Sequence, residues 1–144
     1  MLRTILVEDD FNNLELLETL LIPYQKDLQI VGKARTLKAA VEAIQTLEPD
    51  LVFLDIHLPD GDGFEVLRRT MAQQYALIFT TAFSEYSLRA FDFEATHYLL
   101  KPIDEKALAN AIQRCLKNHQ NNSAPISTAL LEKLLQMPAQ SPKK

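Results

Sequence analysis

The sequence has one cysteine, no long apolar run and no excess of basic residues. A single thiol excludes an internal disulfide and a zinc site built from several cysteines. Cys115 shares an apolar helical stripe with Leu108, Ala111 and Ile112, so we expect it to be a buried small hydrophobe. No apolar stretch reaches the roughly 18 residues that indicate a membrane span, and the N-terminus lacks a signal-peptide layout. These absences predict a cytoplasmic protein with no membrane partner.

The charge balance argues against a further class of function. A net charge of −4 and a pI near 5.3 oppose the broad basic surface that nonspecific nucleic-acid binding requires. Hydrophobic residues at 47% and charged residues at 24% are ordinary for a globular domain with a buried core. The 144 residues fit one domain, since domains usually have roughly 100–200 residues.

The stretch LVFLDIHLPDGDG, residues 51–63, organises the rest of the chain. Its first four residues form a continuous apolar run, which is typical of a parallel strand covered on both faces. Asp55 stands where this strand leaves the sheet, and open parallel sheets bind ligands outside the carboxyl ends of their strands. Pro59, Gly61 and Gly63 then force a sharp loop before the next helix.

Apolar runs and amphipathic stripes alternate along the chain. The five predicted strands lie at residues 5–7, 29–34, 51–54, 76–79 and 97–100. The five predicted helices lie around residues 14–21, 40–47, 64–71, 85–91 and 108–116. Asn12 or Asn13, Thr36 and Asp104 are the expected helix caps, and Pro23 marks the end of the first helix. This alternation predicts an α/β fold with a doubly wound parallel sheet and helices on both faces.

Chemically distinctive residues follow four of these strands. Glu8 and Asp9 follow the first, Asp55 the third, Thr81 the fourth and Lys101 the fifth. Each has an ordinary structural explanation by itself, as a helix cap, a turn acid, a loop hydroxyl or a solvated charge. In a parallel sheet, however, all five meet at one edge. Carboxylates within about 4 Å of each other repel by roughly 4 kcal/mol per pair at an effective dielectric near 20, so a cation is expected among them.

A magnesium ion suits this set of oxygen ligands. Mg²⁺ prefers one or two carboxylates together with waters and phosphate oxygens. The predicted ligands are Asp9, Asp55, Glu8 through a water molecule, and the backbone carbonyl of His57. The remaining parts fit phosphoryl transfer to a carboxylate, with Asp55 as the nucleophile. Lys101 would pair with the phosphoryl group and Thr81 would donate a hydrogen bond to it; without that group, Lys101 would offset the acids.

Four segments in this order resemble the receiver domain of two-component response regulators. They are ILVEDD, LVFLDIHLPDGDGFEVL, IFTTA and YLLKPI, and the resemblance covers residues 1–120. It implies a flavodoxin/CheY-like sheet with strand order 2-1-3-4-5 and a cis Lys101–Pro102 bond. It also implies Mg²⁺-dependent phosphorylation of Asp55 by a sensor histidine kinase, with autodephosphorylation by water. The protein would then be a signalling domain and not an enzyme acting on other substrates.

The resemblance also implies a switch. Tyr98 stands at the position of the family's switch aromatic, and phosphorylation would draw Thr81 toward the phosphoryl group and let Tyr98 turn inward. The surface of the fourth helix, fifth strand and fifth helix would change and serve as a homodimer face, with Arg89, Glu105 and Arg114 on it. His57 and Phe83 stand at positions that tune dephosphorylation in the family.

The segment AFSEYSLRAFDFEATHYLLKPI resembles the LytR/AlgR class, whose receivers precede a DNA-binding domain of LytTR type. Residues 121–144 are expected to be a linker with a short amphipathic helix at 127–136, leading to such an output domain. The protein would then regulate transcription and contact DNA only through that domain. A stand-alone receiver that acts through protein contacts is the alternative.

Three other functions stay open on the residues alone. An aspartyl phosphatase would also form an aspartyl-phosphate at a strand end, but His57 stands where its second acid is expected. An interaction module that has lost phosphorylation would not need the five polar residues at the sheet edge. A flavodoxin-like cofactor binder would need a Gly- or Ser/Thr-rich loop after the first strand, where this sequence is acidic.

Overall fold

The structure is a computed structural model that describes residues 1–82 and 98–120. The helix predicted around residues 85–91, Phe83, Arg89 and the helix predicted at residues 127–136 lie outside this part of the chain. Within it, no helix is long and apolar enough to cross a membrane.

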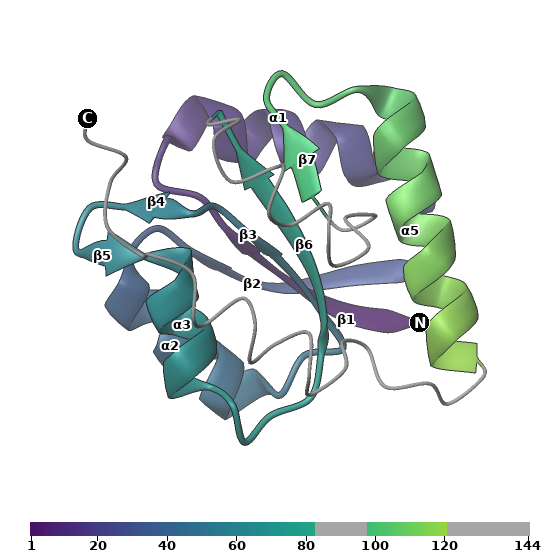
Figure 1. Cartoon of the computed structure of the whole chain (residues 1–144). Coiled ribbons are helices and arrows are strands. Elements are labelled where there is room, and N and C mark those ends of the chain that lie inside the picture. Colours follow the sequence, from purple (N-terminus) through teal and green to yellow (C-terminus); the bar gives the residue numbers. More distant parts are fainter. Residues whose placement is uncertain (83–97, 121–144) are drawn as a thin grey trace.

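A five-stranded parallel sheet forms the centre of the domain (Figure 1). Its strands are β1 (Leu2–Val7), β2 (Leu28–Ala34), β3 (Leu51–Leu54), β6 (Ala76–Thr81) and β7 (Tyr98–Leu100). Their order is β2-β1-β3-β6-β7, which is 2-1-3-4-5 when the strands are numbered within this sheet. This is the order that the family resemblance implies. The Lys101–Pro102 peptide is cis, also as implied.

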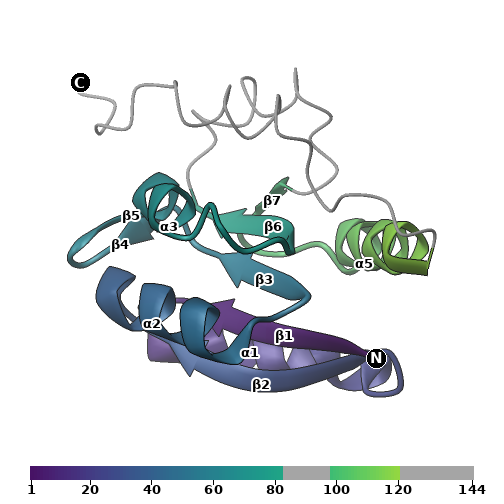
Figure 2. The same cartoon turned by 90° about the horizontal axis from the view of Figure 1, so that it is seen from below.

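Helices cover both faces of the sheet (Figures 1 and 2). They are α1 (Phe11–Leu21), the 3₁₀ helix η1 (Ile22–Tyr24), α2 (Leu37–Leu47), α3 (Gly63–Arg69) and α5 (Glu105–Gln120). The apolar sides of α2 and α3 pack in one core layer, and those of α1 and α5 pack in the other. Successive residues of β3 contribute to these layers in turn: Val52 and Leu54 to the first, Leu51 and Phe53 to the second. The strand is therefore apolar throughout because both of its faces are buried.

Two local predictions need correction. The N-cap of α1 is Asp10 and not Asn12 or Asn13, because the Asp10 carboxylate accepts the N–H groups of both asparagines at 2.8 and 3.2 Å. The stretch predicted as a loop contains a short antiparallel hairpin, formed by β4 (His57–Leu58) and β5 (Gly61–Asp62). The predicted caps Thr36 and Asp104 are confirmed, since each side chain accepts a backbone N–H three residues further on.

The thiol of Cys115 should be inert in the folded protein. Cys115 is only 2% exposed in the α1/α5 layer, and burial raises its pKa to about 12. The thiolate is the reactive form, so at pH 8 the folded chain should react with an aromatic disulfide reagent far more slowly than the chain unfolded in guanidinium chloride. Absorbance of the released thiolate measures both rates. Rapid reaction of one equivalent under native conditions would contradict the predicted burial.

Candidate functional site

The strand ends bring the predicted residues together. β1 and β3 end side by side at Val7 and Leu54, and the backbone N–H of Asp55 donates to the carbonyl of Val7 at 3.1 Å. Thr81 belongs to β6, which is two residues longer than predicted. The N–H of Lys101 donates to the carbonyl of Thr81 at 2.8 Å, which places the lysine beside the end of β6.

Three carboxylates form a cluster that could hold a metal ion. Glu8, Asp9 and Asp55 each place an oxygen within 4.8 Å of the others. Glu8 and Asp55 are 2% and 5% exposed, whereas Asp9 is exposed to solvent. Three carboxylates, one of them exposed to solvent, offer the oxygen ligands that Mg²⁺ prefers, so the residues fit this ion.

Lys101 joins the two buried acids. Its Nζ lies 2.5 Å from Glu8 Oε1 and 2.9 Å from Asp55 Oδ2, and its side chain is 15% exposed. Burial by itself would lower the pKa of Lys101, but the hydrogen bonds to Glu8 and Asp55 outweigh it and raise that pKa. The lysine therefore stays charged and offsets the acids, which is the role predicted for it in the unphosphorylated protein.

Glu8 holds a proton more tightly than an exposed glutamate. Burial is the main cause, and the Asp55 charge adds to it, so that the pKa of Glu8 rises to about 7 despite the hydrogen bond from Lys101. A carboxyl group that must lose a proton before it can bind a cation makes the affinity depend on pH. The affinity of the cluster for a cation should therefore change with pH near neutrality through Glu8.

The stability of the metal-free protein should fall as pH rises toward 7, because of Glu8. The folded state binds the Glu8 proton more tightly than the unfolded chain does, so the carboxyl stabilises the fold below about pH 4.5 and loses this contribution as pH passes through 7. With a chelator present, we expect a loss on the order of 2 kcal/mol between pH 5 and 8. Urea unfolding of wild type and Glu8→Gln isolates the effect, and parallel pH profiles for the two proteins would contradict it.

His57 lies next to Asp55 on the hairpin. Its backbone N–H donates to Asp55 Oδ1 at 3.1 Å, and it pairs with Asp62 across β4 and β5. This bond holds one oxygen of the Asp55 carboxylate, and Lys101 contacts the other. The part of the His57 backbone carbonyl as a metal ligand stays a prediction.

Tyr98 starts β7 and is half-buried. Its ring lies 5.9 Å from that of Phe79, which in turn lies 5.6 Å from the ring of Phe64. Tyr98 therefore packs against the α2/α3 layer. Its part in a switch stays a prediction.

Two residues near the cluster were missed by the sequence analysis. Arg35 donates to the backbone carbonyl of Asp9, and Asp60 accepts two N–H groups at the start of α2. No spacing in the sequence indicates either contact, because the partners are 26 and 22–23 residues apart.

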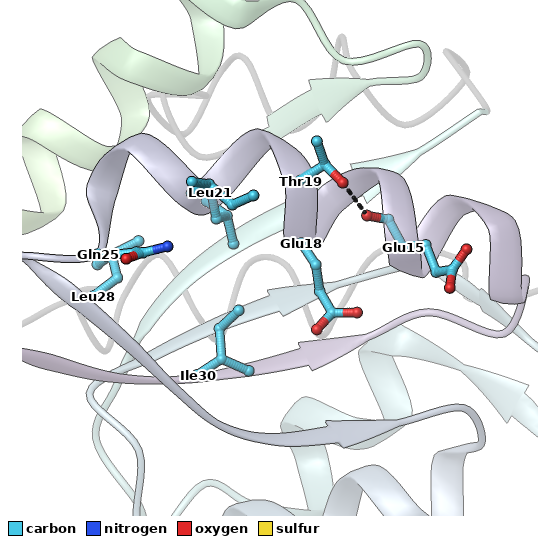
Figure 3. A pocket seen from close by; sticks show the side chains of 8 residues that line it. Glu15, Glu18, Thr19, Leu21, Gln25, Leu28 and Ile30 are labelled. Carbon is cyan, nitrogen blue, oxygen red and sulfur yellow. Dashed lines mark hydrogen bonds between the residues drawn. The ribbon is translucent and has the colours of Figure 1, made fainter.

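A groove of about 550 Å³ lies between α1 and the first half of β2 (Figure 3). Its lining residues are Glu15, Glu18, Thr19, Leu21, Ile22, Gln25, Leu28 and Ile30. None of them is a predicted site residue. The groove is lined by the first residues of β2, whereas the acids lie at the carboxyl ends of the strands. The groove is therefore separate from the candidate site.

The acidic cluster and its lysine, on a sheet of this order, agree with the comparison with known families. The profile of the family described as "Response regulator receiver domain" matches residues 4–113. The chain belongs to this family. Receiver domains are parts of two-component signalling systems, so this receiver is a signalling domain.

The similar proteins are response regulators. The receiver is 35% identical over 123 residues to the sensory transduction protein LytT of Bacillus cereus, covering 84% of this chain and 50% of LytT. It is 36% identical to the transcriptional regulatory protein BtsR of Salmonella typhi, covering 79% and 48% of the two chains. The crystal structure of the response regulatory domain of mrkE from Klebsiella pneumoniae has a TM-score of 0.71 at 29% identity, covering 83% and 98%. The receiver thus spans about half the length of LytT and BtsR.

Proposed function

We propose that Asp55 accepts a phosphoryl group from a sensor histidine kinase in an Mg²⁺-dependent reaction. The observation that carries the proposal is the pair of contacts from Lys101 Nζ to Glu8 and Asp55 inside a cluster of three carboxylates. At this edge of the sheet, Asp55 would supply the nucleophile and the buried Lys101 beside it would supply a positive charge for the transferred group. The bound Mg²⁺ would neutralise charge on the acids and on the phosphoryl oxygens.

The chain's own residues would carry the transfer. Asp55 Oδ attacks phosphorus, the bond from phosphorus to the histidine nitrogen of the kinase breaks, and that nitrogen takes up a proton. Lys101 would move its contact from Asp55 Oδ2 to a phosphoryl oxygen, and the Thr81 hydroxyl would donate to another. The backbone N–H of His57, 3.1 Å from Asp55 Oδ1, supports the position of the carboxylate before attack. Asp9 and Asp55 would hold the metal, with Glu8 acting through a water molecule and the His57 carbonyl as a further ligand.

We further propose that the receiver controls a transcriptional output domain of LytTR type, which would make the contacts to DNA. The support is the likeness to LytT and BtsR, of which this chain covers only 50% and 48%, together with the linker composition of residues 121–144. The α5 side chains Glu105 and Arg114 and the β7 side chain Leu100 are exposed on the predicted homodimer face. A change in oligomeric state on phosphorylation, measured by ultracentrifugation, tests the predicted homodimer face.

Intact mass spectrometry tests the phosphorylation step. The chain is incubated with a small-molecule phosphodonor, with Mg²⁺ in one sample and a chelator in the other. We expect a gain of one phosphoryl group only with Mg²⁺. No gain under conditions where Mg²⁺ binding is separately shown would instead favour an interaction module that works without phosphorylation.

A further inference from the structure

The hairpin next to Asp55 is tied to a helix that contributes no residue to the acidic cluster. Asp60 lies in the turn between β4 and β5, and its carboxylate accepts the N–H of Leu37 at 2.6 Å and that of Lys38 at 3.1 Å. Thr36 Oγ1 accepts the next N–H, from Ala39, at 3.0 Å. The first three N–H groups of α2, which have no partner within a helix, are therefore all satisfied, two of them by the hairpin.

Packing reinforces this connection. A Cβ atom on Gly61 would lie 2.7 Å from the side chain of the buried Leu37, so the hairpin backbone lies directly on the start of α2. The same hairpin pairs His57 with Asp62, and the His57 N–H donates to Asp55. A continuous set of contacts thus runs from α2 through Asp60 and the hairpin to the Asp55 carboxylate.

The residue just before α2 reaches the other loop of the cluster. Arg35 donates to the backbone carbonyl of Asp9 from Nε at 3.2 Å and from Nη2 at 3.0 Å. Its guanidinium also lies 5.9 Å from the centre of the ring of Phe11, the first residue of α1. Residues 35–38, here called the β2–α2 junction, therefore contact both loops that carry the acids.

We propose that the β2–α2 junction positions the acidic site by holding its two loops, with Arg35 and Asp60 as positioning residues. The inference rests on the proposed function for its biological meaning, because the loops it holds carry the phosphoacceptor and the metal ligands. Outer residues that orient metal ligands commonly change affinity or activity by about 10–100-fold when removed. Neither residue touches the reacting atoms.

Asp60→Ala tests the hairpin half of the proposal, with Thr36→Ala as its matched control. Both variants remove a cap from the same helix end, but only Asp60→Ala releases the hairpin. In metal-free protein, we expect the His57 amide, measured by NMR hydrogen exchange, to exchange at least about tenfold faster in Asp60→Ala and at the wild-type rate in Thr36→Ala. The Mg²⁺ dissociation constant should rise roughly tenfold in Asp60→Ala only. Asp60→Asn, which keeps one acceptor oxygen, should recover part of both losses.

Arg35→Met tests the other half, with Lys38→Met as its control. Both remove one positive charge from the junction, and loss of a nearby positive charge should by itself strengthen Mg²⁺ binding. Only Arg35→Met removes the donors to Asp9. We expect Mg²⁺ to bind several-fold more weakly to Arg35→Met and no more weakly to Lys38→Met, measured by calorimetry.

The results separate this proposal from the proposed function. Equal behaviour of Asp60→Ala and Thr36→Ala in amide exchange and Mg²⁺ affinity would overturn the hairpin half, and Mg²⁺ affinity in Arg35→Met equal to that in Lys38→Met would overturn the Asp9 half. Both measurements are made without phosphoryl transfer. A wild-type chain that fails to gain a phosphoryl group would therefore count against the proposed function alone.

Discussion

Replacement of Asp55 by asparagine is expected to abolish the Mg²⁺-dependent gain of a phosphoryl group. The amide oxygen lacks the negative charge that makes the carboxylate a nucleophile, and the variant also removes one of the three acids of the cluster. Asparagine has nearly the same shape and keeps an oxygen that can accept the His57 N–H, so the fold should persist. Intact mass after incubation with a small-molecule phosphodonor gives the result directly.

Asp62→Asn is the matched control for this experiment. Asp62 lies on the hairpin that follows Asp55, where its carboxylate accepts the N–H of Glu65 at 3.0 Å as the N-cap of α3, and it is not part of the cluster. We expect this variant to be phosphorylated at close to the wild-type rate. If Asp55→Asn still gained one phosphoryl group, the acceptor would be another residue and the proposed site would be wrong.

Among the substitutions considered, replacement of Lys101 by methionine should lower the free energy of unfolding the most. It leaves Glu8 and Asp55, whose side chains are 3% and 7% exposed, facing each other without the cation between them. Removing one partner of a buried ion pair costs about 3–5 kcal/mol, and we expect about 3 kcal/mol at pH 8 because Glu8 can take up a proton. Saturating Mg²⁺ should restore most of this loss. Phosphorylation should slow by roughly 10²-fold, since a charge that stabilises the transferred group is missing.

Lys33→Met shows whether the effect depends on burial. Lys33 Nζ lies 2.9 Å from Glu18, but the two side chains are 46% and 34% exposed. Loss of such an exposed pair should cost no more than about 1 kcal/mol, with no recovery on adding Mg²⁺. Urea unfolding with chelator and with Mg²⁺ compares the two variants. Equal losses would mean that Lys101 does not offset a buried acidic cluster.

The proximity of the acids and the lysine was predictable because it follows from the alternation of strands and helices along the chain. An apolar run such as residues 51–54 indicates a strand covered on both faces, and parallel strands place whatever follows them at one edge. Asp55 and Lys101 could therefore be brought together without knowledge of their contacts. The end of β6 was placed two residues too early, since Thr80 and Thr81 are polar although both are buried.

Contacts that depend on local geometry or on distant partners were not predictable in this way. Asp10, Asn12 and Asn13 are all good caps by residue type, and only the backbone path decides that Asp10 is the cap. The strands β4 and β5 have two residues each, which no periodicity can reveal. Asp60 accepts the N–H of Leu37 only because the fold places the hairpin over the start of α2, and no residue near Asp60 in the sequence indicates this contact.

The division of β3 between the two apolar layers has an evolutionary consequence. The strand separates the side chains of α2 and α3 from those of α1 and α5 with four fully buried residues. Substitutions that repack one layer should therefore have little effect on the packing of the other, since core substitutions couple mainly between residues in contact. The two surfaces of the domain can diversify independently, so that recognition of a new partner on one side need not disturb a working interface on the other.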